Sequence, residues 1–251
     1  MKHSFFRNLN SILLAGIVMA SHATAFAQSK NTANRNISPP PSADLNYTIQ
    51  ANQKGLTLDG SAIVHWSADA KTYSVTTETR AMMLGKILEA KSEGLIDSFG
   101  LAPVTSTEKR FRKDLTTTTF DRQNKNITFS ASAATYPIKG GEQDRNSAVW
   151  QIASLARANQ FKPGNTIALF VAGQKDADAW TFKIGKQEKI NTALGQLNTL
   201  QISKVIKDSS KEQKVDIWLA PSRNWYPVRL RFTEPNGDFI EQTIEKITPK
   251  S

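Results

Sequence analysis

Apolar and polar residues alternate with a period of two along most of this chain, starting near Leu45. Successive side chains of a β-strand point to opposite faces, so this period indicates strands with one buried face and one solvated face. The threonine run over residues 116–119 also favours a strand, because β-branched side chains suit a pleated surface. The clearest alternating runs are residues 58–66, 73–80, 167–171, 180–184, 200–206 and 226–233, with a less regular last run over residues 239–247. The pattern predicts a mainly β protein with roughly a dozen strands.

Turn-forming segments separate these runs. They are residues 68–70, 123–126, 139–141 and 235–238, which are rich in Asn, Gly and Asp. Asn and Gly accept the positive φ that tight hairpins need. Regularly spaced hairpins place consecutive strands side by side and antiparallel, without βαβ crossovers, so we expect a large antiparallel sheet.

One segment, residues 146–160, departs from the period of two. Its apolar residues follow the helical i, i+3, i+4, i+7 spacing: Val149, Ile152, Ala153 and Ala156. Asp144 or Asn146 can cap its start, and Pro163-Gly164 ends it. The segment predicts a single helix inserted between two groups of strands.

The first 27 residues have the layout of a secretory signal peptide. Lys2 and Arg7 precede an apolar run over residues 12–20, and Ala25-Phe26-Ala27 fits an A-x-A cleavage site. The apolar run is shorter than the ~20 residues that a membrane-spanning helix needs. We therefore expect cleavage after Ala27, a periplasmic protein and no transmembrane segment in the mature chain; an uncleaved N-terminal anchor is the alternative.

Residues 28–43 are polar and contain Pro39-Pro40-Pro41, which is typical of a disordered or extended lead-in. The alternating pattern that follows predicts a single β-rich domain over residues 44–248. A domain of that length can bury a substantial core without disulfides.

The chain is basic, with 32 Lys and Arg against 22 Asp and Glu and a formal net charge of +10. Such a surface attracts anionic lipid head groups, acidic glycans or nucleic acid, of which nucleic acid is not expected for an exported protein. An ordinary basic protein with scattered lysines is the alternative, and the densest basic stretch is only residues 109–113. The chain contains no cysteine, which excludes thiolate catalysis, Cys-ligated metals and a lipidated N-terminal Cys, so we do not expect a lipoprotein.

Two segments near the C-terminus are the most specific in the chain: Trp218-Leu219-Ala220-Pro221 and Tyr226-Pro227-Val228-Arg229. Together with the helical segment and the strands around them, they resemble the domain-of-unknown-function 3108 family of exported proteins of Gram-negative bacteria, over residues 44–247. The resemblance implies a large, strongly curved antiparallel sheet that forms an open or closed barrel. It implies no catalytic residues, because the activity of the family is unsettled.

His65 is the only histidine after the predicted cleavage site. It lies at one of the polar positions of its alternating strand. The pattern places no Ser or Asp where it could complete a catalytic triad, so a surface histidine is favoured. A single histidine also excludes a His-rich metal site. Lys139-Gly140-Gly141 is not surrounded by the strand, Gly-rich turn and Lys-Ser/Thr of a phosphate-binding loop. We interpret it as a loop before the helix.

Two pairs of carboxylates lie four residues apart: Glu89 with Glu93, and Glu241 with Glu245. At about 3.3 Å per residue, this spacing puts ~13 Å between them on one strand face. Glycosidase carboxylates lie closer together, so a solvated face is favoured. We predict no catalytic residue and no cofactor.

The best candidates for a ligand-binding site lie in one short stretch: Trp218, Trp225, Tyr226, Arg229 and Arg231. Trp and Tyr can stack on sugar rings or pack around acyl chains, and Arg pairs with phosphate or carboxylate. The alternative is a packed hairpin in which the arginines pair across strands with Glu241 or Glu245.

These observations favour an exported soluble cell-envelope protein, not an enzyme, that binds an amphiphilic or anionic ligand such as a lipid or glycan. The alternative is a structural or interaction module that assists envelope assembly through protein partners, because an unpaired sheet edge is enough for β-augmentation. A hydrolase is the least favoured class.

Overall fold

The structure is a computed structural model that describes residues 36–159, 161–206 and 212–250. The predicted signal peptide, its cleavage site and residues 28–35 of the lead-in lie outside these residues. The described elements are β1 (Ala43–Gln53), β2 (Leu56–Ala68), β3 (Thr72–Ala81), β4 (Gly85–Asp97), β5 (Gly100–Arg110), β6 (Thr116–Asp121), β7 (Asn126–Phe129), β8 (Ser132–Pro137), β9 (Gln143–Asp144), α2 (Arg145–Arg157), β10 (Thr166–Ala172), β11 (Ala177–Thr192), β12 (Gly195–Lys204), β13 (Lys214–Ala220), the short 3-10 helix η1 (Pro221–Arg223), β14 (Tyr226–Thr233) and β15 (Phe239–Pro249).

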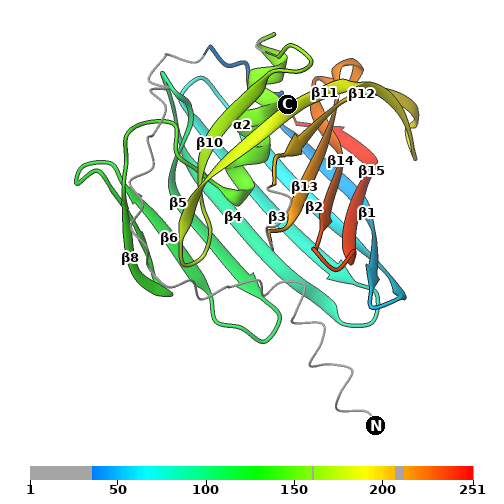
Figure 1. Cartoon of the computed structure of the whole chain (residues 1–251), viewed down its shortest axis with the longest axis horizontal. Helices are drawn as coiled ribbons and strands as arrows, with labels where there is room; N and C mark the ends of the chain where they lie inside the picture. Colours follow the sequence, from blue (N-terminus) through cyan, green and yellow to red (C-terminus); the bar gives the residue numbers. More distant parts are fainter. Residues whose placement is uncertain (1–35, 160, 207–211, 251) are drawn as a thin grey trace.

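All fifteen described strands belong to one sheet (Figure 1). Their spatial order is β8-β7-β6-β5-β4-β3-β2-β1-β15-β14-β13-β12-β11-β10-β9. Consecutive strands are therefore neighbours, except β8 and β9 at the two edges, and β1 also pairs with β15. The short β9–β10 pair is parallel, and the other pairs are antiparallel. This arrangement confirms the prediction of a mainly antiparallel β protein with one helix.

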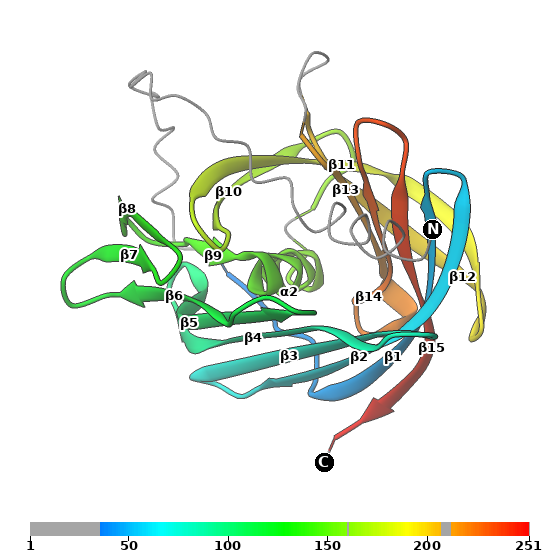
Figure 2. The same cartoon turned by 90° about the horizontal axis from the view of Figure 1, so that it is seen from below.

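The sheet curves into an open barrel around α2 (Figure 2). No backbone hydrogen bonds join its two end strands, β8 and β9, in the part of the chain that the structure describes. Side chains fill the seam instead: the Thr118 hydroxyl donates to the Gly173 carbonyl at 2.8 Å, and the rings of Tyr136 and Phe170 are 5.8 Å apart. Of the two predicted forms, the open one is therefore correct.

The helix α2 begins at Arg145 and ends at Arg157, close to the predicted span of 146–160. Asp144, one of the two predicted caps, accepts hydrogen bonds from the backbone N–H groups of Asn146 and Ser147. The helix ends three residues early because Ala158 leaves the helical conformation and Asn159 takes a positive φ of 58°.

Aromatic stacking holds α2 against the concave face of the sheet. The ring of Trp150 lies 4.0 Å from that of Trp66 on β2, with only 4° between the planes. Tyr226 on β14 meets Trp150 edge-on at 6.3 Å. Because large aromatic side chains contribute much of the buried apolar area of a core, these contacts fix the helix between the two halves of the sheet.

Buried polar groups fix the start of α2. Asp144 is 1% exposed and accepts a hydrogen bond of 2.5 Å from the hydroxyl of Ser92 on β4. Ser92 also contacts the Tyr73 hydroxyl at 2.9 Å. Burial raises the pKa of the Asp144 carboxyl, although the hydrogen bonds from Ser92 and the helix start oppose this shift.

The end of the proline-rich lead-in, residues 36–42, contacts the rest of the domain through backbone carbonyls. The Trp66 indole N–H donates to the Pro40 carbonyl at 2.9 Å, and the Tyr226 hydroxyl donates to the Pro41 carbonyl at 2.7 Å. Arg157 at the end of α2 donates to Pro39 at 3.2 Å. These contacts use backbone carbonyls, which a hydrophobic pattern does not reveal.

We predict that Asp144→Ala lowers the free energy of unfolding by about 2 kcal/mol, because the helix loses its cap and Ser92 loses its acceptor. Asp144→Asn keeps an acceptor at the cap and should cost less. Urea denaturation of the three proteins measures both changes, and equal stability of wild type and Asp144→Ala would contradict the assignment.

The same variants test the pKa shift. Because the folded-state pKa of Asp144 is raised, ionisation of this carboxyl favours unfolding. The stability of the wild type relative to Asp144→Asn should therefore fall as the pH rises from about 3.9, the usual pKa of Asp, through the raised value.

Candidate functional site

The structure separates the five predicted ligand-binding residues. Trp218 on β13 lies directly opposite Arg229 on β14, with the guanidinium 5.9 Å from the indole ring. Arg231 lies on the same side of β14, two residues along, opposite Asp216. Tyr226 instead contacts α2 and the lead-in, and is 3% exposed.

The carboxylate of Glu241 pairs with both arginines. Glu241 on β15 lies opposite Arg231 and contacts it at 3.3 Å and Arg229 at 3.4 Å. Arg229 also donates to the Asn191 carbonyl at 2.9 Å, and the indole N–H of Trp218 donates to Glu188 at 2.5 Å. This geometry is the packed hairpin that the sequence left as an alternative, and ligand binding by these residues stays a prediction.

Trp225 follows the short helix η1, where Asn224 and Trp225 both have positive φ, 52° and 63°. Its backbone N–H donates to the Ala220 carbonyl at 2.9 Å, and its side chain packs against the main core. Trp225 therefore closes the β13–β14 turn, and it does not join Arg229 and Arg231.

The candidate catalytic residues lie in ion pairs on the surface. His65 is exposed and contacts Asp44 at 2.6 Å, a partner that only the β1–β2 pairing reveals. Lys250 contacts the same carboxylate at 2.6 Å. Glu89 pairs with Lys86 at 2.5 Å. Among the described residues, no group of three His, Cys, Asp or Glu side chains could hold a metal ion.

A feature that the sequence analysis missed lies at one end of the sheet. When the neighbouring strands of an antiparallel sheet are consecutive in the chain, every second turn lies at the same end of the sheet. The β1–β2, β3–β4 and β5–β6 turns therefore lie together (Figure 1). The β14–β15 turn joins them, since the Lys54 backbone N–H donates to Asp238 at 2.8 Å, and β12 ends beside the start of β13.

Large apolar side chains are exposed at this end. Seven such side chains are exposed among the described residues, and five of them lie here, a group that we call the apolar rim: Leu56, Met82, Met83, Leu115 and Val205. Met82 is 80% exposed and Met83 is 94% exposed, on the tip of the β3–β4 turn. Exposed apolar side chains that gather at one end of a molecule can mark an interaction site.

Basic residues accompany the apolar rim. Lys54 lies in the β1–β2 turn, and Arg112 and Lys113 lie in the β5–β6 turn, all exposed. Arg112 stacks on the Phe111 ring at 4.9 Å. In the described structure these three cations form no ion pair, and Asp114 is the one acidic residue of the three turns. These three turns therefore combine exposed apolar side chains with a net positive charge, whereas the neighbouring β14–β15 turn carries Glu234 and Asp238.

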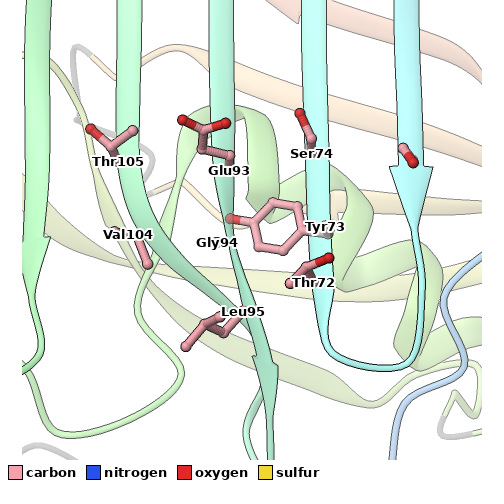
Figure 3. A pocket seen from close by; sticks show the side chains of 9 residues that line it. Thr72, Tyr73, Ser74, Glu93, Gly94, Leu95, Val104 and Thr105 are labelled. Carbon is pink, nitrogen blue, oxygen red and sulfur yellow. The ribbon is translucent and has the colours of Figure 1, made fainter.

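The other two exposed apolar residues, Leu95 and Val104, border a shallow hollow on strands β2 to β5 (Figure 3). Its volume is about 430 Å³. It is lined by Ser67, Thr72, Tyr73, Ser74, Glu93, Gly94, Leu95, Val104 and Thr105. Within the described residues, no helix is long and apolar enough to cross a membrane.

The fold defines an open, barrel-like β protein. It is similar to a beta-barrel-like protein of the domain of unknown function DUF1849 from Brucella abortus, with a TM-score of 0.56 and 12% identity over 87% of this chain and 100% of that chain. The chain belongs to the DUF3108 family, described as proteins of unknown function, whose model matches residues 46–245. This membership confirms the resemblance seen in the sequence.

Two further structures are more distant. A protein from Bacteroides fragilis that is described as exported, with a YmcC-like fold, is 9% identical over 85% of this chain and 99% of that chain, with a TM-score of 0.35. A domain described as an outer membrane lipoprotein-sorting protein from Vibrio parahaemolyticus is 9% identical over 84% of this chain and 86% of that chain, with a TM-score of 0.33. No curated protein matches the chain by sequence.

We predict that replacing Arg229 and Arg231 together with Gln lowers the free energy of unfolding by about 1 kcal/mol, because Glu241 loses both partners. Thermal or urea unfolding measures the loss, with the exposed Arg223→Gln as control. If the double variant melts like wild type but loses a lipid or glycan that co-purifies with the wild type, the arginines serve a ligand instead.

Proposed function

We propose that this protein binds an anionic amphiphile of the cell envelope, a lipid with a negatively charged head group, without catalysing a reaction on it. The apolar rim carries the proposal, because five of the seven exposed large apolar side chains lie at one end of the described structure. The three unpaired cations of the same turns suit a negative head group.

The apolar contribution to binding outweighs the electrostatic one. Transfer of a Met or Leu side chain from water into hydrocarbon contributes about 1.5–3 kcal/mol when burial is complete. A Lys or Arg near an anionic lipid surface contributes about 1 kcal/mol, and salt weakens it. Partial burial of the rim therefore supports reversible binding, with the cations selecting negatively charged lipids.

The chemistry of the rim favours a lipid over a glycan. Its exposed side chains are aliphatic or thioether groups, which offer no row of hydrogen-bonding partners to the hydroxyl groups of a sugar. The predicted signal peptide and the net charge of +8 that remains after its removal, from 30 Lys and Arg against 22 Asp and Glu, support the same ligand class. The interaction module and the hydrolase stay alternatives.

We predict that the purified protein sediments with vesicles of phosphatidylglycerol and phosphatidylcholine, and binds vesicles of phosphatidylcholine alone much more weakly. Replacing Met82 and Met83 with Ser should weaken binding to the anionic vesicles about tenfold or more, because their apolar transfer is lost. Added salt should weaken binding of the wild type.

A pair of charge-matched variants separates the rim from overall charge. Arg112→Gln with Lys113→Gln removes two cations at the rim and should weaken binding. Lys71→Gln with Lys125→Gln removes two exposed cations from turns at the opposite end, and should leave binding unchanged. The proposal fails if both pairs weaken binding equally, or if wild type does not distinguish the two vesicle types.

A further inference from the structure

The hollow on strands β2 to β5 is a second feature that the apolar rim does not explain. It lies toward the end of the sheet opposite to the rim, since Leu95 is ten residues along β4 from Gly85, the first residue after the β3–β4 turn. At about 3.3 Å per residue, this separation is about 33 Å. The hollow is therefore a separate site.

A β-bulge creates the hollow. The pairing of β4 with β5 shifts between Glu93 and Gly94, so that Glu93 lies opposite Thr105 and Gly94 lies opposite Pro103. Val104 is the extra residue and is 42% exposed. Only glycine fits at position 94, because a Cβ atom there would lie 2.2 Å from the Ala102 carbonyl oxygen. Bulges of this kind commonly re-aim side chains near functional sites.

The hollow is a trough with one polar wall and one aliphatic wall (Figure 3). The polar wall is a row of side chains on four neighbouring strands, each directly opposite the next: Ser67, Ser74, Glu93 and Thr105. Strand spacing of about 4.8 Å makes this row about 14 Å long. Leu95 and Val104 form the aliphatic wall, together with Thr72, which pairs with Leu95.

We propose that this trough binds a neutral oligosaccharide. A sugar ring presents hydroxyl groups along its edge and C–H groups on its face, which match the polar wall and the aliphatic wall. A carboxylate accepts hydrogen bonds from adjacent hydroxyls, as Glu93 is placed to do. The length of the row and the volume of about 430 Å³ fit a few linked rings.

The charges of the trough argue for a neutral ligand. Glu93 would repel an anion, and it pairs with Lys91 at 2.6 Å, so a cation would have to displace that lysine. An acyl chain would leave the polar wall without partners. An extended peptide would need free backbone groups, whereas strands β2 to β5 use theirs in the sheet ladder. The site is independent of the proposed lipid binding.

The test is a titration of the isotope-labelled protein with chitotetraose, a neutral tetrasaccharide, followed by NMR, with tetragalacturonate as the anionic counterpart. We expect weak binding of chitotetraose, at about millimolar affinity or tighter, because the trough is shallow. The backbone signals that move should be those of residues around Ser74, Glu93 and Thr105.

Glu93→Gln should weaken binding of chitotetraose about fivefold, because an amide is a weaker acceptor than a carboxylate. The matched control is Glu89→Gln on the same strand, which should bind like wild type. The proposal is overturned by absence of binding at about 10 mM chitotetraose, by equal affinity of Glu93→Gln and wild type, or by tighter binding of tetragalacturonate. Unchanged spectra of the free variants verify their folding.

Discussion

The antiparallel order of neighbouring strands decides where each turn of this molecule lies. Because strands that follow one another in the chain are neighbours in the sheet, apart from the two edge strands β8 and β9, alternate turns within each half fall at opposite ends of the sheet. The pairing of β1 with β15 joins the two halves and extends this rule around the open barrel. Residues as far apart in sequence as Leu56 and Val205 thereby reach the same end of the sheet, where both are exposed.

Two other segments of the chain, α2 and the lead-in, cover the concave face of this sheet. The stacking of Trp150 on Trp66 holds α2 inside the curve, and Asp144 ties the start of the helix to Ser92 on β4. The lead-in packs beside this cluster through the carbonyls of Pro40 and Pro41. Structural contacts thus occupy the interior around α2, and the two proposed binding sites lie on the surface: the apolar rim for a lipid, and the trough at Glu93 for a sugar.

The sequence predicts the local structure well, because alternation, turn residues and capping act over short distances. The strands, the helix near residues 146–160 and the cap at Asp144 follow from such patterns. Contacts between side chains on different strands are harder to predict from the sequence. Arg231 meets Glu241 as one alternative expected, but the contact of His65 with Asp44 depends on a strand partner that the pattern does not specify. The apolar rim was missed for the same reason, since single exposed residues such as Met83 gain meaning only once their turns are known to lie together.

The orientation of the protein on a lipid surface tests the central claim most directly. The chain has no cysteine, so Met83→Cys at the rim and Ala70→Cys in the β2–β3 turn at the opposite end each allow one environment-sensitive fluorophore to be attached. On addition of vesicles containing phosphatidylglycerol, we predict a blue shift and protection from an aqueous quencher for the label at position 83. The label at position 70 should remain as exposed to water as before. Equal responses at the two positions, or a response at position 70 alone, would contradict binding through the apolar rim.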